Sequence, residues 1–159
     1  MRRTGRVAAI VAVAIAFASV VGRGAARNER GDDEQGRGCS NMTIRGTYGV
    51  QIQGTRPSAP GGPIESVIGV VTRTYDGRGG FTQVDNVKGA ISGTVPDREG
   101  FGTYEVRPDC TAIVHAQPGP NILLEERIVI VDNGRELLSA TIQPPPVMVT
   151  ARGVRLHTW

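Results

Sequence analysis

Apolar and polar residues alternate from Ser40 onward with a period of two residues, rather than the 3.6 of a helix. Such alternation is typical of β-strands that bury one face. The clearest case is segment 44–53, in which every second residue belongs to one face. That face carries Ile44, Gly46, Tyr48, Val50 and Ile52, and the other carries Arg45, Thr47, Gly49, Gln51 and Gln53. The segment is therefore predicted to be a strand with its first set of side chains in a core.

Glycine and proline divide the rest of the chain into short segments of this kind. The further predicted strands are 64–75, 81–87, 91–95, 101–107, 111–117, 122–132, 135–142 and 147–156. The turn sequences between them include RPSAPGGP at 56–63, DGRGG at 76–80, PDREG at 96–100, PDC at 108–110, PGPN at 118–121, NG at 133–134 and PPP at 144–146. Glycine supplies the positive φ of tight turns, and Asn-Gly between apolar runs is a strong hairpin signal.

About eight or nine strands joined mostly by tight turns predict an all-β fold. Tight turns connect neighbours in sequence, which gives an antiparallel up-and-down order. Closing the sheet on itself would remove its exposed edges. We therefore expect an antiparallel up-and-down barrel of about eight strands over residues 39–159, with a β-sandwich as the alternative.

The first residues have the pattern of an export signal. Residues 1–6 carry three arginines, residues 7–21 form an apolar run, and small residues follow up to Ala26. A charged start and a short apolar run are typical of a secretory signal peptide, and about 20 apolar residues would be needed for a stable transmembrane helix. We predict a signal peptide over 1–26 and a disordered, polar leader over 27–38. An uncleaved N-terminal anchor is the alternative.

Export changes the charge of the protein. Four of the 18 basic residues lie in the predicted signal peptide, namely Arg2, Arg3, Arg6 and Arg23. No acidic residue lies there, so the exported chain would have 14 basic and 15 acidic residues, a net charge of −1. A nucleic-acid partner is therefore not expected, because it requires a basic surface. We expect a secreted or periplasmic protein with no membrane span in the mature chain.

The exported chain contains two cysteines, Cys39 and Cys110. An even pair in an oxidising compartment is normally joined. We predict a disulfide that ties the start of the folded region to the turn at 108–110. The chain-entropy model gives roughly 4 kcal/mol for a loop of this length.

Catalytic, cofactor and metal motifs were sought along the whole chain. The two histidines, His115 and His157, lack the spacing of a metal site. The nearest string to a nucleophile elbow is GAISG at 89–93, in which the serine is misplaced. The glycines form neither a dinucleotide-binding fingerprint nor a phosphate-binding loop. We therefore expect no cofactor and no metal. The absence of a catalytic motif favours a non-enzymatic protein over an enzyme, which stays open as an alternative, and no feature indicates the oligomeric state.

Segment 122–132 is the strongest apolar strand that also contains charged residues. One face has Leu123, Glu125, Arg127, Val129 and Val131, and the other has Ile122, Leu124, Glu126, Ile128 and Ile130. Neither face is wholly apolar, so a charged group of this strand can point into the interior. Arg127 is the candidate, because it lies between apolar runs.

A second strand has similar character, since Glu65, Arg73 and Tyr75 share one face of 64–75. A barrel of about eight strands can hold one small ligand. A buried Glu65–Arg127 pair beside a tyrosine would form such a binding site. The candidate ligand-binding residues are Glu65, Arg127, Tyr48, Tyr75 and Tyr104. In the alternative, these polar groups face solvent and side chains fill the barrel.

Four short motifs occur in a familiar order. They are Cys39-Ser40-Asn41, Gly46-Thr47-Tyr48-Gly49, Asp76-Gly77-x-Gly79-x-Phe81 and Gly102-Thr103-Tyr104-x-Val106-x-x-Asp109-Cys110-Thr111. Over roughly 39–155 the chain resembles small secreted bacterial β-barrel proteins whose architecture is of the allene oxide cyclase or calycin type. These are turn and disulfide motifs, so the resemblance implies a fold and not an activity. No catalytic residue of the plant cyclases is matched.

These observations lead to three functional hypotheses. The first is a non-enzymatic secreted barrel that binds a small apolar molecule or an envelope component. It predicts an interior cavity with convergent polar groups. The second is a structural or protein-interaction module of the envelope, which predicts a filled barrel and an exposed apolar patch. The third is a cyclase- or isomerase-like enzyme, which predicts a buried carboxylate with a raised pKa beside a tyrosine.

Overall fold

The computed structural model of the protein describes residues 38–157. The predicted signal peptide and the predicted leader, except for Gly38, lie outside the described residues. Within residues 38–157, no helix is long and apolar enough to cross a membrane.

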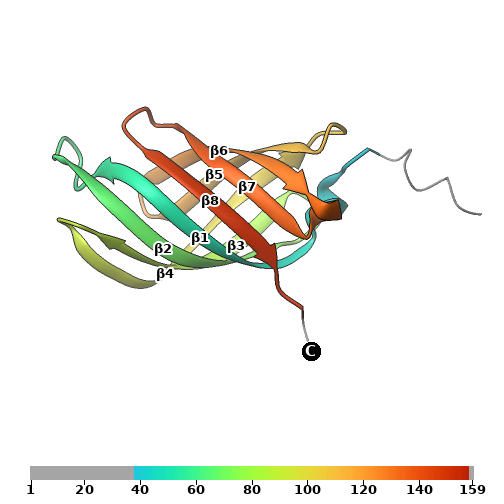
Figure 1. The fold of residues 1–159 in the computed structure, drawn as a ribbon, viewed down its shortest axis with the longest axis horizontal. Helices are drawn as coiled ribbons and strands as arrows, with labels where there is room; N and C mark the ends of the chain where they lie inside the picture. The colour runs from blue at the N-terminus through green and yellow to red at the C-terminus, as the bar shows by residue number, and fades with distance from the viewer. Residues whose placement is uncertain (1–37, 158–159) are drawn as a thin grey trace, which may run out of the picture. The chain divides into compact units, whose positions relative to one another are not determined.

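Eight antiparallel strands follow one another in sequence order around a closed barrel, and the last strand pairs with the first (Figure 1). The predicted up-and-down barrel is thus confirmed. The strands are β1 (Gly46–Pro57), β2 (Ile64–Tyr75), β3 (Gly80–Gly89), β4 (Gly93–Val106), β5 (Thr111–Gly119), β6 (Ile122–Val131), β7 (Glu136–Gln143) and β8 (Met148–Arg155). Two short 3₁₀ helices, η1 (Asn41–Ile44) and η2 (Asp132–Gly134), complete the fold.

Because the strands run alternately up and down, their connections divide between two ends of the barrel. We call one end the base; it carries the connections at 76–79, 107–110 and 132–135. We call the other end the mouth; it carries the connections at 58–63, 90–92, 120–121 and 144–147. The two ends differ in composition and in packing.

The sequence predicts a turn at 96–100, and this prediction is wrong, because β4 runs through it without interruption. Two residues of β4, Pro96 and Asp97, lie opposite the single residue Asn86 of β3, which is a β-bulge. Asp97 adopts a φ of 46°, and its N–H donates to Asn86 Oδ1 at 3.1 Å. The bulge accommodates Pro96 within β4. It also shifts the alternation of inward and outward side chains by one residue, so that Arg98 faces the interior.

Aromatic rings fill the base of the barrel. All three tyrosines and Phe81 are buried there, and Tyr75 lies at their centre. Its ring makes edge contacts with Tyr104, at a centroid distance of 4.9 Å, and with Tyr48, at 5.6 Å. Such tilted arrangements are favoured by the quadrupoles of the rings. Ile44 of η1 is fully buried against this cluster.

The phenol groups of the base bond to the segments that cover it. Tyr48 Oη donates to the carbonyl of Gly134 in η2 and accepts from Arg155 Nη2 at 2.8 Å. Tyr104 Oη accepts the N–H of Gly77 at 2.9 Å and donates to the carbonyl of Asn41 in η1. The base is therefore a closed, hydrogen-bonded plug.

The predicted disulfide joins Cys39 to Cys110, with their Cα atoms 4.9 Å apart. It fastens the segment before η1 to the β4–β5 turn at the base, where Cys39 N also donates to the carbonyl of Pro108 at 3.2 Å. A disulfide is typical of proteins that fold in an oxidising, exported compartment.

Removal of the disulfide tests how far the base depends on it. We expect the double variant Cys39→Ala/Cys110→Ala to unfold with a free energy lower by roughly 4 kcal/mol, because the unfolded chain regains the entropy of an open loop. Urea unfolding followed by circular dichroism measures the difference. An unchanged unfolding free energy in the variant would contradict the prediction.

Candidate functional site: a cavity in the mouth half of the barrel

The mouth half of the barrel contains a cavity of about 440 Å³ that is partly open to solvent. Its wall is apolar and consists mainly of small or β-branched side chains. These are Val50, Ile52, Val67, Val71, Val87, Val95, Ala116, Leu124, Val149 and Ala151. The aromatic residues that fill the base have no counterparts here, so interior volume is left over.

A buried ion pair forms part of the cavity floor. Arg73 of β2 donates from Nη1 and Nη2 to the two carboxylate oxygens of Glu126 of β6, at 2.9 and 3.1 Å. Both side chains are nearly inaccessible to solvent, and both line the cavity. Arg73 Nη1 also donates to Tyr75 Oη at 3.3 Å, and the guanidinium lies 4.7 Å from the ring centre of Phe81. The pair therefore joins the cavity floor to the aromatic plug.

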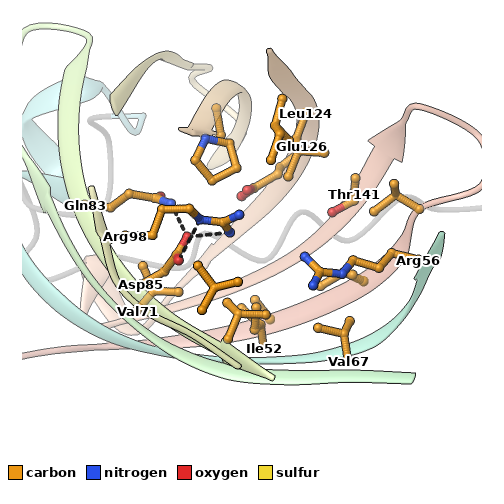
Figure 2. Close-up of a pocket in the computed structure, with 18 of the residues that line it drawn as sticks. Ile52, Arg56, Val67, Val71, Gln83, Asp85, Arg98, Leu124, Glu126 and Thr141 are labelled. Carbon is orange, nitrogen blue, oxygen red and sulfur yellow. Dashed lines mark hydrogen bonds and ion pairs between the residues drawn. The ribbon is translucent and has the colours of Figure 1, made fainter. Parts of the chain in front are cut away.

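The rest of the floor continues from Arg73 across β3 to β4. Arg73 Nε donates to Gln83 Oε1 at 2.9 Å, and Gln83 Nε2 donates to Asp85 Oδ2 at 3.3 Å. Asp85 accepts two bonds from Arg98, from Nε and Nη2, each at 3.0 Å (Figure 2). With Glu126, the floor network contains two arginines and two carboxylates. Its charges balance, and among the described residues no buried side-chain polar atom lacks a partner.

The floor network shifts the pKa values of Arg73 and of the neighbouring Tyr75. Burial alone would lower the pKa of Arg73, but the charges of Glu126 and the bonds to Glu126 and Tyr75 raise it above its ordinary value. Burial raises the pKa of the Tyr75 hydroxyl, and the nearby Arg73 offsets part of that rise. Arg73 therefore stays charged, and Tyr75 stays neutral.

At the mouth, Glu65 holds the strand ends together. Its Oε2 accepts the N–H groups of Ile91 and Ser92, each at 2.8 Å, and its Oε1 accepts Ser92 Oγ at 2.6 Å and Arg56 Nε at 3.1 Å. These bonds, those from Ser92 above all, lower the pKa of Glu65 to about 2, although burial acts in the opposite direction. Gly89 makes the arrangement possible, because a Cβ there would collide with the Glu65 carboxylate.

The cavity therefore offers an apolar wall with a few fixed polar groups. Figure 2 shows Arg56 and Arg98 reaching into it from opposite sides. Ser139 and Thr141 of β7 add hydroxyl groups to the wall. Such a site can take up an apolar body and orient one polar substituent.

No family model, curated protein or solved structure matches the chain. The function is therefore inferred from the cavity itself. In residues 38–157, no three histidine, cysteine, aspartate or glutamate side chains are grouped so that they could hold a metal ion.

The structure separates the five residues that the sequence suggests for a ligand site. Tyr48, Tyr75 and Tyr104 belong to the plug at the base and do not line the cavity. Glu65 is buried as expected, and it shares the inner face of β2 with Arg73 and Tyr75. Glu65 itself does not line the cavity, but it accepts hydrogen bonds from Arg56 and Ser92, which do.

The expected pair between Glu65 and Arg127 is not formed. Arg127 lies on the outer face of β6, where its side chain is 46% exposed and pairs with Glu125 at 2.8 Å. The inner face of β6 is the one with Glu126 and Ile128, because Ile128 packs in the core. The sequence places a charge on each face of this strand, and the prediction that Arg127 points inward is wrong, because Glu126 occupies the inner face.

Several residues of the floor are absent from the sequence-based set, namely Gln83, Asp85, Arg98 and Glu126. A period-two reading of 80–89 would have placed Gln83 and Asp85 on the same face as Phe81 and Val87, which is a usable signal. No such signal exists for Arg98, because its orientation depends on the bulge.

We expect Arg73→Met to lower the free energy of unfolding by about 3–5 kcal/mol, because Glu126 then becomes a buried charge without a partner. In Arg73→Met/Glu126→Leu both charges are gone, so this variant should be more stable than the single variant. Urea unfolding compares them. If the double variant is as unstable as the sum of the two single variants, the pairing does not account for the loss.

The lowered pKa of Glu65 predicts that the fold loses stability in acid. Its pKa falls from 4.5 to about 2 in the folded state, so its bonds stabilise the fold in full above 4.5 and are lost as the pH falls towards 2. We expect the gap in unfolding free energy between the wild type and Glu65→Gln to close over that interval. Urea unfolding at a series of pH values measures it. A gap that is independent of pH would rule out this role for Glu65.

Proposed function

We propose that this protein binds a small, predominantly apolar molecule in the mouth half of its barrel and has no catalytic role. The observation that carries the proposal is the cavity of about 440 Å³ above a fully paired polar floor. Its volume lies within the range of about 300–1,000 Å³ that is common for small-molecule sites. An apolar wall with few polar groups is also characteristic of such sites.

A purely structural module is a weaker candidate, because it would be expected to fill its interior with side chains. An enzyme of the cyclase or isomerase kind would need a carboxylate that is free to exchange a proton. Each buried carboxylate of the described residues is instead bonded to an arginine: Glu65 to Arg56, Asp85 to Arg98 and Glu126 to Arg73. This pairing favours binding over catalysis.

The proposed site of action is outside the cytoplasm. The disulfide between Cys39 and Cys110 supports this, as does the signal-peptide pattern of residues 1–26. We further propose that the chain is related to small secreted bacterial barrels of the allene oxide cyclase or calycin type. The closed eight-stranded topology supports this relationship.

Titration with Nile red, a neutral apolar dye that brightens in apolar surroundings, tests the proposal. We expect one molecule to bind per chain. Ala151→Phe places a ring in the cavity and should weaken binding at least about tenfold, a change of 1.4 kcal/mol. Mass spectrometry of the native protein from its own host would then show which small molecule co-purifies.

The matched control is Thr150→Phe, which places the same ring on the exposed outer face of β8, one residue away. It should leave dye binding unchanged. Equal loss in both variants would mean that the dye does not occupy the interior, and no binding by the wild type would refute the proposed function. Circular dichroism checks that both variants are folded.

A further inference from the structure

Large apolar side chains project from the connections and strand ends that surround the mouth. Leu123 and Met148 are 72% and 71% exposed, more than any other large apolar residue among those described. Ile64 and Ile91 are also more than half exposed. We call these four residues the mouth tips. Ile91 lies in the connection 90–92, and Ile64, Leu123 and Met148 lie at the strand starts that follow the other three mouth connections, so the mouth tips surround the cavity opening.

The two ends of the barrel differ sharply in charge. The base connections contain Asp76, Arg78, Arg107, Asp109, Asp132 and Arg135, whereas the mouth connections contain no charged residue. Near the mouth, the charged residues of the adjoining strand ends are Arg56, Glu65, Lys88 and Glu125, the last of which lies opposite Gln143 at the end of β7. Glu65 is buried and bonded to Arg56, whereas Lys88 is exposed. The mouth therefore presents apolar groups and the positive Lys88, and its partly exposed carboxylate, Glu125, is paired with Arg127.

Proline stiffens this end. Eight of the ten prolines lie in the mouth connections or at the strand ends that adjoin them: Pro57, Pro60, Pro63, Pro118, Pro120, Pro144, Pro145 and Pro146. Proline fixes φ and limits the conformations of a loop. The mouth tips are thus held outward, and folding them back over the opening would require the loops to bend where they are stiffest.

We infer that the mouth docks on the surface of a lipid bilayer with anionic headgroups. Separate apolar side chains around the mouth can each enter the fluid region between headgroups and acyl chains. A rigid protein partner, in contrast, would need a matching pocket for each of them. The positive Lys88 complements an anionic surface, because Glu65 and Glu125 are each paired with an arginine. Docking in this orientation would place the cavity opening against the lipid.

This inference rests on the proposed function, because it names the source from which the cavity takes its ligand. The ligand would then be a lipid-soluble molecule that passes from the bilayer into the barrel without crossing water. The two proposals nevertheless fail separately, since dye binding in solution and vesicle binding are independent measurements.

Vesicle flotation tests the inference with the exported protein, recovered after processing in an expression host. The vesicles contain equal parts of phosphatidylcholine and phosphatidylglycerol, or phosphatidylcholine alone. We expect the wild type to float with both, and more of it with the anionic mixture. Leu123→Glu/Met148→Glu should reduce the bound fraction on the order of tenfold or more, because it places charges where apolar tips enter the bilayer.

The matched control is Leu138→Glu/Met42→Glu, which makes the same two substitutions at exposed positions on the outer wall and at the base. It should float like the wild type, and thermal unfolding without vesicles checks that both double variants are folded. Equal loss in both, or a wild type that stays with neither vesicle, would overturn the inference. So would self-association through the mouth without flotation, which would show that the tips bind a second copy.

The outcomes distinguish this inference from the proposed function. If Nile red enters the cavity but the wild type does not float, the docking inference fails and the binding function stands. If the wild type floats with vesicles and Leu123→Glu/Met148→Glu does not, but no dye enters the cavity, then the binding function fails and the docking surface stands.

Discussion

The ion pair between Arg73 and Glu126 sets the internal organisation of this barrel. The two residues belong to β2 and β6, which lie on opposite sides of an eight-stranded ring. Their side chains therefore span the interior, with aromatic packing on one side and the cavity on the other. A buried pair is costly to desolvate and survives only when its remaining polar atoms are bonded. Tyr75 and Gln83 supply those bonds, so the position of the pair is fixed by the residues around it.

The cavity follows from a change in side-chain size across this pair. Rings fill the base, while valine, alanine and serine face the interior towards the mouth. In many folds such a deficit of volume would be removed by collapse. Here the wall is a continuous hydrogen-bonded sheet, which cannot move inward without losing backbone bonds along whole strands. The apolar space is thus maintained by the backbone and not by the side chains that line it.

The sequence was sufficient for the fold, because alternation and turn residues are local signals. It was less informative where the structure depends on contacts across the barrel. The turn expected at 96–100 is a bulge, and only pairing with Asn86 reveals this. The placement of Arg127 failed because β6 carries charge on both faces, and packing of Ile128 decides between them. Glu126, the charged partner of Arg73, is 53 residues away in sequence, so no period along the chain could pair the two.

The separation of the two ends has a consequence for variation in this scaffold. The disulfide, η1, η2 and the phenol bonds all belong to the base, which they cover. The loops around the opening share no bond with that closure. Relatives or designed derivatives can thus exchange these loops, and with them the choice of guest, without altering the contacts that cover the base. The covered base and the loops around the opening are encoded in different stretches of the same short chain.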